Sequence, residues 1–188
     1  MVLSKLAQEV SGALVATVKG ADDVIAALRG AVKNQVAGAL KDVSDTATSG
    51  MDMVTDISKG SISAASQVGV SLTDAVKDMA SSVLSGVSEV GGDTLSAVSN
   101  MAKGVVAGAA EVGENVGQVA VLTVEGVVSQ ASSFGLDVTQ ATKEAVLGVV
   151  KGADEVSDEV GKSVRNALLS AASLPRDVVE KVVKGSES

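Results

Sequence analysis

The chain has 188 residues, a length that suits one domain or one extended element, and it is 46% hydrophobic but only 1% aromatic. Its formal net charge of −8 disfavours nucleic acid as a partner, because nucleic acid needs a basic face, and it weakens attraction to anionic membranes. The sequence contains no cysteine and no histidine, which excludes a disulfide framework and thiolate chemistry and removes the commonest general base and metal ligand.

The N-terminal segment does not have the pattern of a secretory signal, because Glu9 falls where the apolar region of such a signal would lie. No stretch of the chain reaches the roughly 18 uncharged apolar residues of a membrane span. The longest uncharged run, 60–73, is short and rich in serine and glycine. These features predict an intracellular protein, soluble or peripherally bound, with no transmembrane span.

One apolar pattern runs along the whole chain. Three series of positions, which step by eleven residues from Val2, Leu6 and Val10, hold none of the 15 basic and 23 acidic residues. Offsets of four, four and three residues between the series place them on one face of a helix, with about 3.67 residues per turn. The pattern predicts an all-α fold of long amphipathic helices with a continuous eleven-residue repeat, in which residues 1–188 form a single repetitive domain.

The apolar stripe is the predicted packing or surface-binding face. It is represented by Val83, Val105, Val116, Val127, Val138, Val149, Val160, Val112, Phe134 and Val156. Glycines spaced by four residues flank the stripe, where they would allow the backbones of two helices to approach closely. These predicted close-packing glycines are Gly104, Gly108, Gly113, Gly117, Gly148 and Gly152.

Four segments are expected to interrupt the helix, near 44–50, 89–94, 132–137 and 173–177, because they combine glycine, proline and short polar residues. In the second of them, Asp93 or Thr94 is a predicted N-cap. Glycines also recur every 22 residues, at 69, 91, 113 and 135, a spacing that also fits hinges in one curved helix. Three arrangements stay open: an elongated hairpin, four helices of about 40 residues, or one extended helix.

No set of residues in the sequence forms a convincing catalytic site. The segment VGKS at 160–163 resembles the end of a phosphate-binding loop, but Val156 stands where the first glycine of that motif belongs. Adjacent carboxylates, such as Asp22 and Asp23, have no accompanying pocket residues and are expected to be solvated. We therefore predict no enzyme activity, no catalytic residues, no cofactor and no metal site.

Two segments carry a resemblance to known families. ATKEAVLGVVK at 141–151 is similar to the eleven-residue repeats of synucleins, and SAVSNMAKGVVAGAAEVGENVGQ at 96–118 resembles perilipin repeats. The 22-residue spacing is also similar to that of apolipoprotein-like helices. These resemblances imply an open amphipathic helix that coats membranes or lipid droplets.

Two functions are consistent with these features. The first is adsorption of the amphipathic helices to an apolar or lipid surface, such as a lipid droplet, a granule or a neutral bilayer, because helices this rich in glycine and valine need burial to form. The second is a self-associating bundle or filament, in which the stripes bury one another and copies of the chain form a homo-oligomer. Protection against desiccation or cold is a third interpretation. The composition argues against it, because the chain is more apolar than a solvating protectant.

Overall fold

The computed structural model describes residues 21–42 and 47–185, and within these ranges the chain is helical apart from short connections. The elements in order are α2 (Ala21–Asp42), α3 (Ala47–Gln67), α4 (Leu72–Glu89), α5 (Thr94–Glu111), α6 (Val116–Ala131), the 3-10 helix η1 (Ser132–Phe134), α7 (Val138–Val156), α8 (Asp158–Ser170) and α9 (Arg176–Gly185). The predicted all-α class is therefore confirmed. None of these helices is long and apolar enough to cross a membrane.

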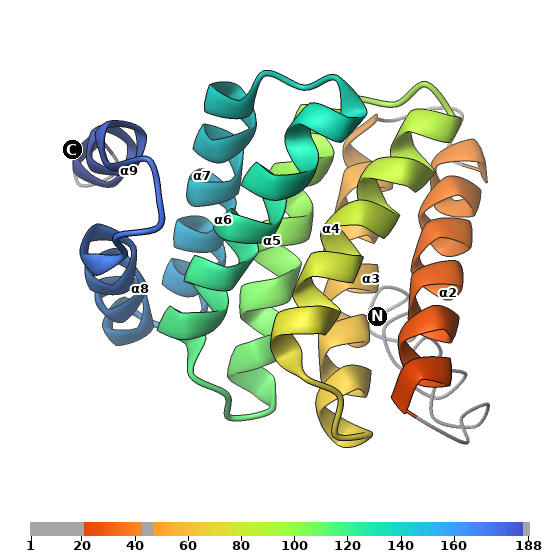
Figure 1. Ribbon diagram of the computed structural model, residues 1–188, viewed down its shortest axis with the longest axis horizontal. Helices are drawn as coiled ribbons and strands as arrows, with labels where there is room; N and C mark the ends of the chain where they lie inside the picture. The colour runs from red at the N-terminus through yellow and green to blue at the C-terminus, as the bar shows by residue number, and fades with distance from the viewer. Residues whose placement is uncertain (1–20, 43–46, 186–188) are drawn as a thin grey trace.

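The helices form two layers, and from α2 to α7 each helix packs mainly on a helix two places away along the chain. One layer contains α3, α5 and α7, and the other contains α2, α4, α6 and α8; α9 closes the end by packing on α7 and α8. Figure 1 shows this succession from α2 on the right to α9 on the left, with α4 and α6 drawn over α3 and α5. Figure 1 shows that consecutive helices from α2 to α7 run in opposite directions, so neighbours within a layer run parallel.

The turns between helices recur every 22 residues and have one construction. Gly69, Gly91, Gly113 and Gly135 each adopt a positive φ of 68–74°. Each ends its helix by a Schellman pattern, in which the backbone N–H of the following residue donates to a carbonyl five residues earlier, as in Glu114 to Ala109 at 3.0 Å. A left-handed residue at this position favours glycine, because a Cβ would be strained there.

A serine, aspartate or asparagine follows two positions after each of these glycines, and three of these four residues cap the next helix. The Asp93 side chain accepts hydrogen bonds from the backbone N–H groups of Leu95 and Ser96. The side chains of Asn115 and Asp137 each accept one hydrogen bond, from the backbone N–H of the residue three positions later. Ser71 occupies the equivalent position before α4 without a side-chain cap bond. The glycine therefore ends one helix and the capping residue starts the next, so the 22-residue unit contains its own turn.

The predicted helix lengths are wrong, and so are the three arrangements based on them. The longest described helix, α2, has 22 residues, and turns interrupt the chain at 68–71 and 112–115, where no break was expected. The recurring glycines are turn residues, not hinges in a continuous helix. Of the four expected breaks, those near 89–94, 132–137 and 173–177 contain or adjoin connections, whereas 43–46 lies outside the described residues and 47–50 belongs to α3.

The core lies between the two layers and is made of aliphatic side chains. Its largest fully buried members include Leu28, Ile57, Met79, Leu84 and Met101. The buried serine and threonine hydroxyls mostly donate to the carbonyl one turn earlier in their own helix, as Thr123 does to Val119 at 2.7 Å. Valine, alanine and glycine fill the remaining space, which lets the helices approach closely.

Candidate functional site

The predicted stripe is divided between the middles and the ends of the helices. Val83, Val105, Val127 and Val149 lie at mid-helix and are fully buried between the layers. Val116, Val138 and Val160 lie in the first turns of their helices. Val112 and Phe134 stand directly before turn glycines. All five side chains are half-buried. Only Val156 is exposed, at 43%. Most of the predicted apolar face is therefore covered by the chain itself.

Four of the predicted close-packing glycines lie against the backbone of a neighbouring helix. A Cβ added to Gly104 of α5 would lie 2.1 Å from the backbone oxygen of Thr55 in α3, and one on Gly108 would lie 2.7 Å from that of Lys59. Real Cβ atoms essentially never approach other atoms below 3.0 Å. At both positions a side chain would collide with the carbonyl of the neighbouring helix, so glycine is required for this spacing.

The same contact recurs 44 residues later between α5 and α7. A Cβ on Gly148 would lie 2.2 Å from the backbone oxygen of Ser99, and one on Gly152 would lie 2.8 Å from that of Lys103. Both contacts match their earlier counterparts to within about 0.1 Å. The α3–α5 and α5–α7 interfaces are therefore two copies of one packing arrangement.

Ion pairs repeat with the glycines. Lys59 Nζ lies 2.6 Å from Glu111 Oε1 across α3 and α5, and Lys103 Nζ lies 2.8 Å from Glu155 Oε1 across α5 and α7. In the other layer, Lys33 pairs with Glu89 at 3.1 Å, and its hydrogen bond and charge lower the pKa of that carboxyl. These pairs are largely exposed, so they set the alignment of the helices more than their stability.

The two remaining predicted glycines behave differently. Gly117 of α6 is buried, and a Cβ there would lie 3.1 Å from Cβ of Ala167 in α8. Gly113 is not a close-packing residue: it lies in the α5–α6 turn with a φ of +74°, and a Cβ would meet nothing within 4 Å. The pairing of Gly113 with Gly117 is therefore wrong, because a turn separates them.

One carboxylate is only partly solvated beside the repeated interface. Burial raises the pKa of Asp56 in α3, although Lys59 acts to lower it. The Oδ2 atom of Asp56 is buried and accepts no hydrogen bond from the described residues. The charge of Asp52, one turn earlier in α3, also acts to raise the Asp56 pKa.

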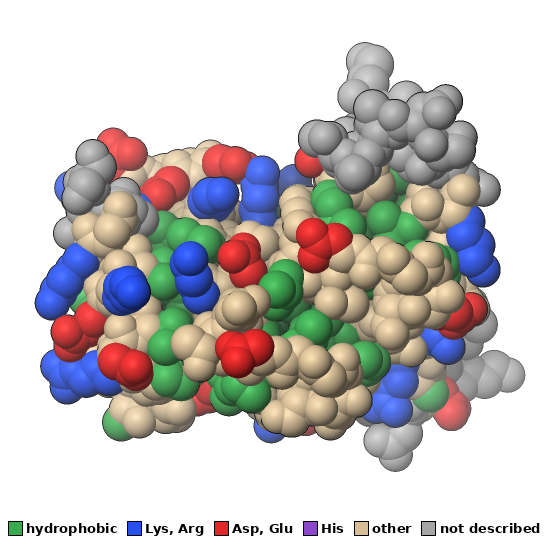
Figure 2. Space-filling view, turned by 90° about the horizontal axis from the view of Figure 1, so that it is seen from above, with side chains coloured by type: hydrophobic (Ala, Val, Ile, Leu, Met, Phe, Trp, Pro, Cys, Tyr) green, Lys and Arg blue, Asp and Glu red, His purple; other side chains and the backbone are tan. Residues whose placement is uncertain are grey.

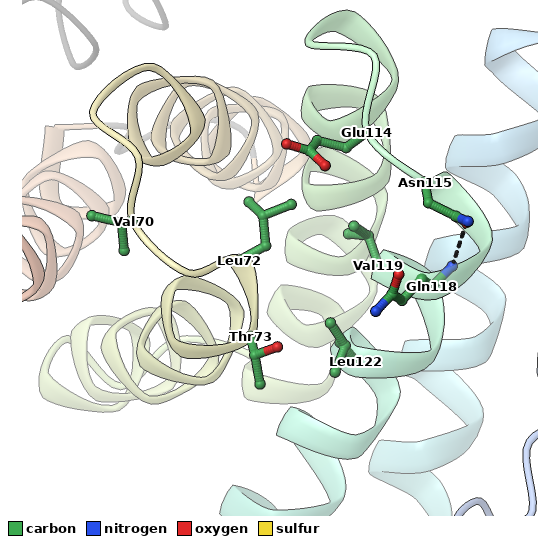
Figure 3. Close-up of a pocket in the computed structure, with 8 residues that line it drawn as sticks. All are labelled: Val70, Leu72, Thr73, Glu114, Asn115, Gln118, Val119 and Leu122. Carbon is green, nitrogen blue, oxygen red and sulfur yellow. Dashed lines mark hydrogen bonds between the residues drawn. The ribbon is translucent and has the colours of Figure 1, made fainter.

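A pocket of about 340 Å³ lies between the α3–α4 and α5–α6 turns. Figure 3 shows its walls, with Val70, Leu72 and Thr73 on one side and residues 114–122 on the other. Its single ionisable lining group, Glu114, accepts a hydrogen bond from Ser66 at 3.3 Å, and the Asn115 side chain already caps α6 through the N–H of Gln118. The polar groups therefore serve the turns and provide no acid–base pair.

A second cavity, of about 430 Å³, is lined by residues of α7 and α9. At this end of the array, on the left of Figure 2, hydrophobic surface shows between Lys and Arg side chains. Within the described ranges, no group of three or more acidic side chains is placed to hold a metal ion. A scan against protein-family models and a search of curated proteins both gave no match to this chain.

Sequence reasoning identified Asp93 as a possible N-cap but missed the caps Asn115 and Asp137, and it missed the α7–α9 cavity. The three caps share one sequence signal, an aspartate or asparagine two positions after a recurring glycine, at 93, 115 and 137. The cavity had no local sequence signal, because it depends on how the last helix meets α7.

Proposed function

We propose that this chain is a non-enzymatic structural protein, whose amphipathic helices are built to pack on one another and, in the assembled protein, on further copies of the chain. The observation that supports this proposal is the repeated contact of paired glycines with the carbonyls of the neighbouring helix. A helix that only adsorbs to a fluid apolar surface has no need of glycine at a fixed position against a backbone oxygen. A helix that packs at backbone distance on a rigid partner does need glycine there, because a side chain would collide with the partner's carbonyl.

The burial of the stripe supports the same proposal. Valine and glycine are poor helix formers, so the helices need burial for their stability, and the two layers provide it within the chain. The lysine–glutamate pairs add a preference for one alignment of neighbouring helices, since a shift by one turn would separate them. Helical repeat arrays of this kind act as spacers and scaffolds by their shape and rigidity.

Circular dichroism in buffer without any lipid or oil tests the proposal. The expected result is full helicity and one cooperative thermal transition. Light scattering over a range of concentrations then tests association between copies. A chain that stays disordered and monomeric without an apolar surface would refute the structural function.

Adsorption to an apolar surface is the second candidate, favoured by the way the array ends. The short helix α9 contributes three buried side chains, Val179, Val182 and Val183, and among the described helices it packs mainly on α7 and α8. Release of α9 would expose valines of α7 without breaking the rest of the array. This candidate predicts that V179D, which loosens α9, speeds co-flotation of the protein with a neutral oil emulsion. Unchanged adsorption would contradict opening at this end.

A further inference from the structure

We propose that the groove between α7 and α9 binds one molecule of a single-chain anionic amphiphile, a fatty carboxylate in its monomeric form. The groove has a volume of about 430 Å³, which lies within the usual range for small-molecule sites. Its lining includes Lys143 and Leu147 of α7 and Asp177, Val178, Lys181 and Val182 of α9. This inference goes beyond the proposed structural function and does not depend on it.

The groove exists because α9 does not repeat the packing of the earlier helices. Lys143 and Leu147 stand 44 residues after Ser99 and Lys103, whose carbonyls meet the paired glycines of α7. The one glycine of α9, Gly185, has nothing within 4 Å of an added Cβ, and Val178 lies on the α9 wall of the groove. Bulky side chains on both walls keep the two backbones apart, so a space remains where the preceding interfaces are closed.

The shape of the groove fits one extended chain. The α7 wall follows a ridge of residues spaced by four, and the α9 wall follows residues 177–185 on one face of that helix. Eight residues of helix correspond to a length of about 12 Å. Leu147 and Val178 are half-buried and Val182 is buried, so the floor is aliphatic. A groove of this length and lining suits the alkyl tail of a medium-chain amphiphile and is too small for a folded protein.

The charges around the groove specify the head group. Lys143 and Lys181 lie on opposite walls, and neither forms a salt bridge within the described part of the chain. Their aliphatic stems can cover the tail while their ammonium groups face solvent. Asp177 leaves the lining with a net charge of +1. A carboxylate placed between the two lysines forms charge-assisted hydrogen bonds that a neutral or cationic head group cannot form.

Titration calorimetry of the full chain with dodecanoate, kept below its micelle-forming concentration, tests the site. We expect saturable binding of one molecule per chain. Replacing both groove lysines, in K143Q/K181Q, should weaken binding about fivefold, because two exposed ion pairs are worth on the order of 0.5 kcal/mol each. Replacing Val178 by serine should weaken it further by making the floor polar.

The matched control is K151Q/K162Q, which makes the same change of charge at two exposed lysines of α7 and α8 that do not line the groove. It should bind dodecanoate as the original chain does, and dodecyltrimethylammonium should not compete. Circular dichroism of each variant checks that α9 remains folded. The proposal is overturned by absence of saturable binding, by equal weakening in the control, by uptake of many molecules with loss of helicity, or by binding to carboxylate-containing vesicles but not to the monomer. The structural function would survive each of these results if the free chain still unfolds cooperatively.

Discussion

The replacement of Gly104 by alanine is the most direct test of the repeated helix interface. The added Cβ would lie 2.1 Å from the Thr55 oxygen and 2.9 Å from Cβ of Ser58, whereas ordinary contacts begin at 3.4 Å. The obstructing oxygen belongs to a helix backbone and cannot rotate away, so α5 must move away from α3 by about 1 Å. Overpacking of this kind costs about 3 kcal/mol at its upper end, and the better helix propensity of alanine returns about 1 kcal/mol. The net loss in the free energy of unfolding is about 2 kcal/mol.

Thermal unfolding followed by circular dichroism measures this effect, and two glycines serve as controls. A loss of about 2 kcal/mol lowers Tm by about 4–8 °C in a chain of this size. Gly30 in α2 has nothing within 4 Å of an added Cβ, and Gly126 in α6 has its nearest atom at 3.7 Å. Alanine at either control position should raise Tm by about 2–4 °C, because only the propensity gain applies. If G104A also raised Tm, the close approach of α3 and α5 would not be a feature of the folded protein.

Three further predictions concern the caps, the ion pairs and the buried stripe. D93A should lower the free energy of unfolding by about 1 kcal/mol and S71A by less, because the Asp93 side chain caps its helix and the Ser71 side chain does not. Hydrogen bonds from Ser96 lower the pKa of Asp93 from its ordinary value, so this stabilisation is present near neutral pH and is lost as the pH falls through the lowered pKa. Unfolding of D93A and of the original chain at pH 7 and at pH 2 measures this loss. A double-mutant cycle on Lys103 and Glu155 should give a coupling below about 1 kcal/mol that shrinks in 1 M salt, and a salt-independent coupling would contradict an exposed pair. V149A, at a fully buried position, should cost about 2 kcal/mol by urea unfolding, and a value near zero would mean that the stripe is not packed.

The sequence predicted the helical class and the buried face but not where the helices end. The stripe was visible because a buried helix face excludes charge whatever covers it, so Val105 and Val149 could be identified without a structure. The turns at 68–71 and 112–115 were misread because the apolar spacing passes through them unchanged. Val112 and Val116 occupy stripe positions on either side of a turn, so the pattern alone did not show that the chain reverses there. The glycine at Gly113 followed by a cap at 115 was the local signal that did.

Which helices pack on one another could not be predicted from the sequence, for a different physical reason. Paired glycines indicate close approach, but they do not say which helix approaches, and Gly104 could have met any small-residue face. The partner is fixed by the 22-residue unit: since each unit reverses the chain, the nearest parallel helix is two units away, which is 44 residues. The ion pairs agree with this choice of partner, because Lys59 of α3 pairs with Glu111 of α5, two helices along the chain, and Glu89 of α4 pairs with Lys33 of α2.

The unusual composition of the helices follows from this architecture. A helix that packs at backbone distance on a neighbour on each side needs glycine on one face and small or β-branched side chains on the other, and each of these lowers its stability in isolation. The stability lost within each helix has to come from its interfaces, so α5 depends on both α3 and α7. In such an array the stability of a unit depends on its nearest neighbours, which makes the middle units the most protected and the end units the first to open. The short helix α9, which has neighbours on one side only and a groove where the close contact would be, is the place where the described array is most open to a ligand or to unfolding.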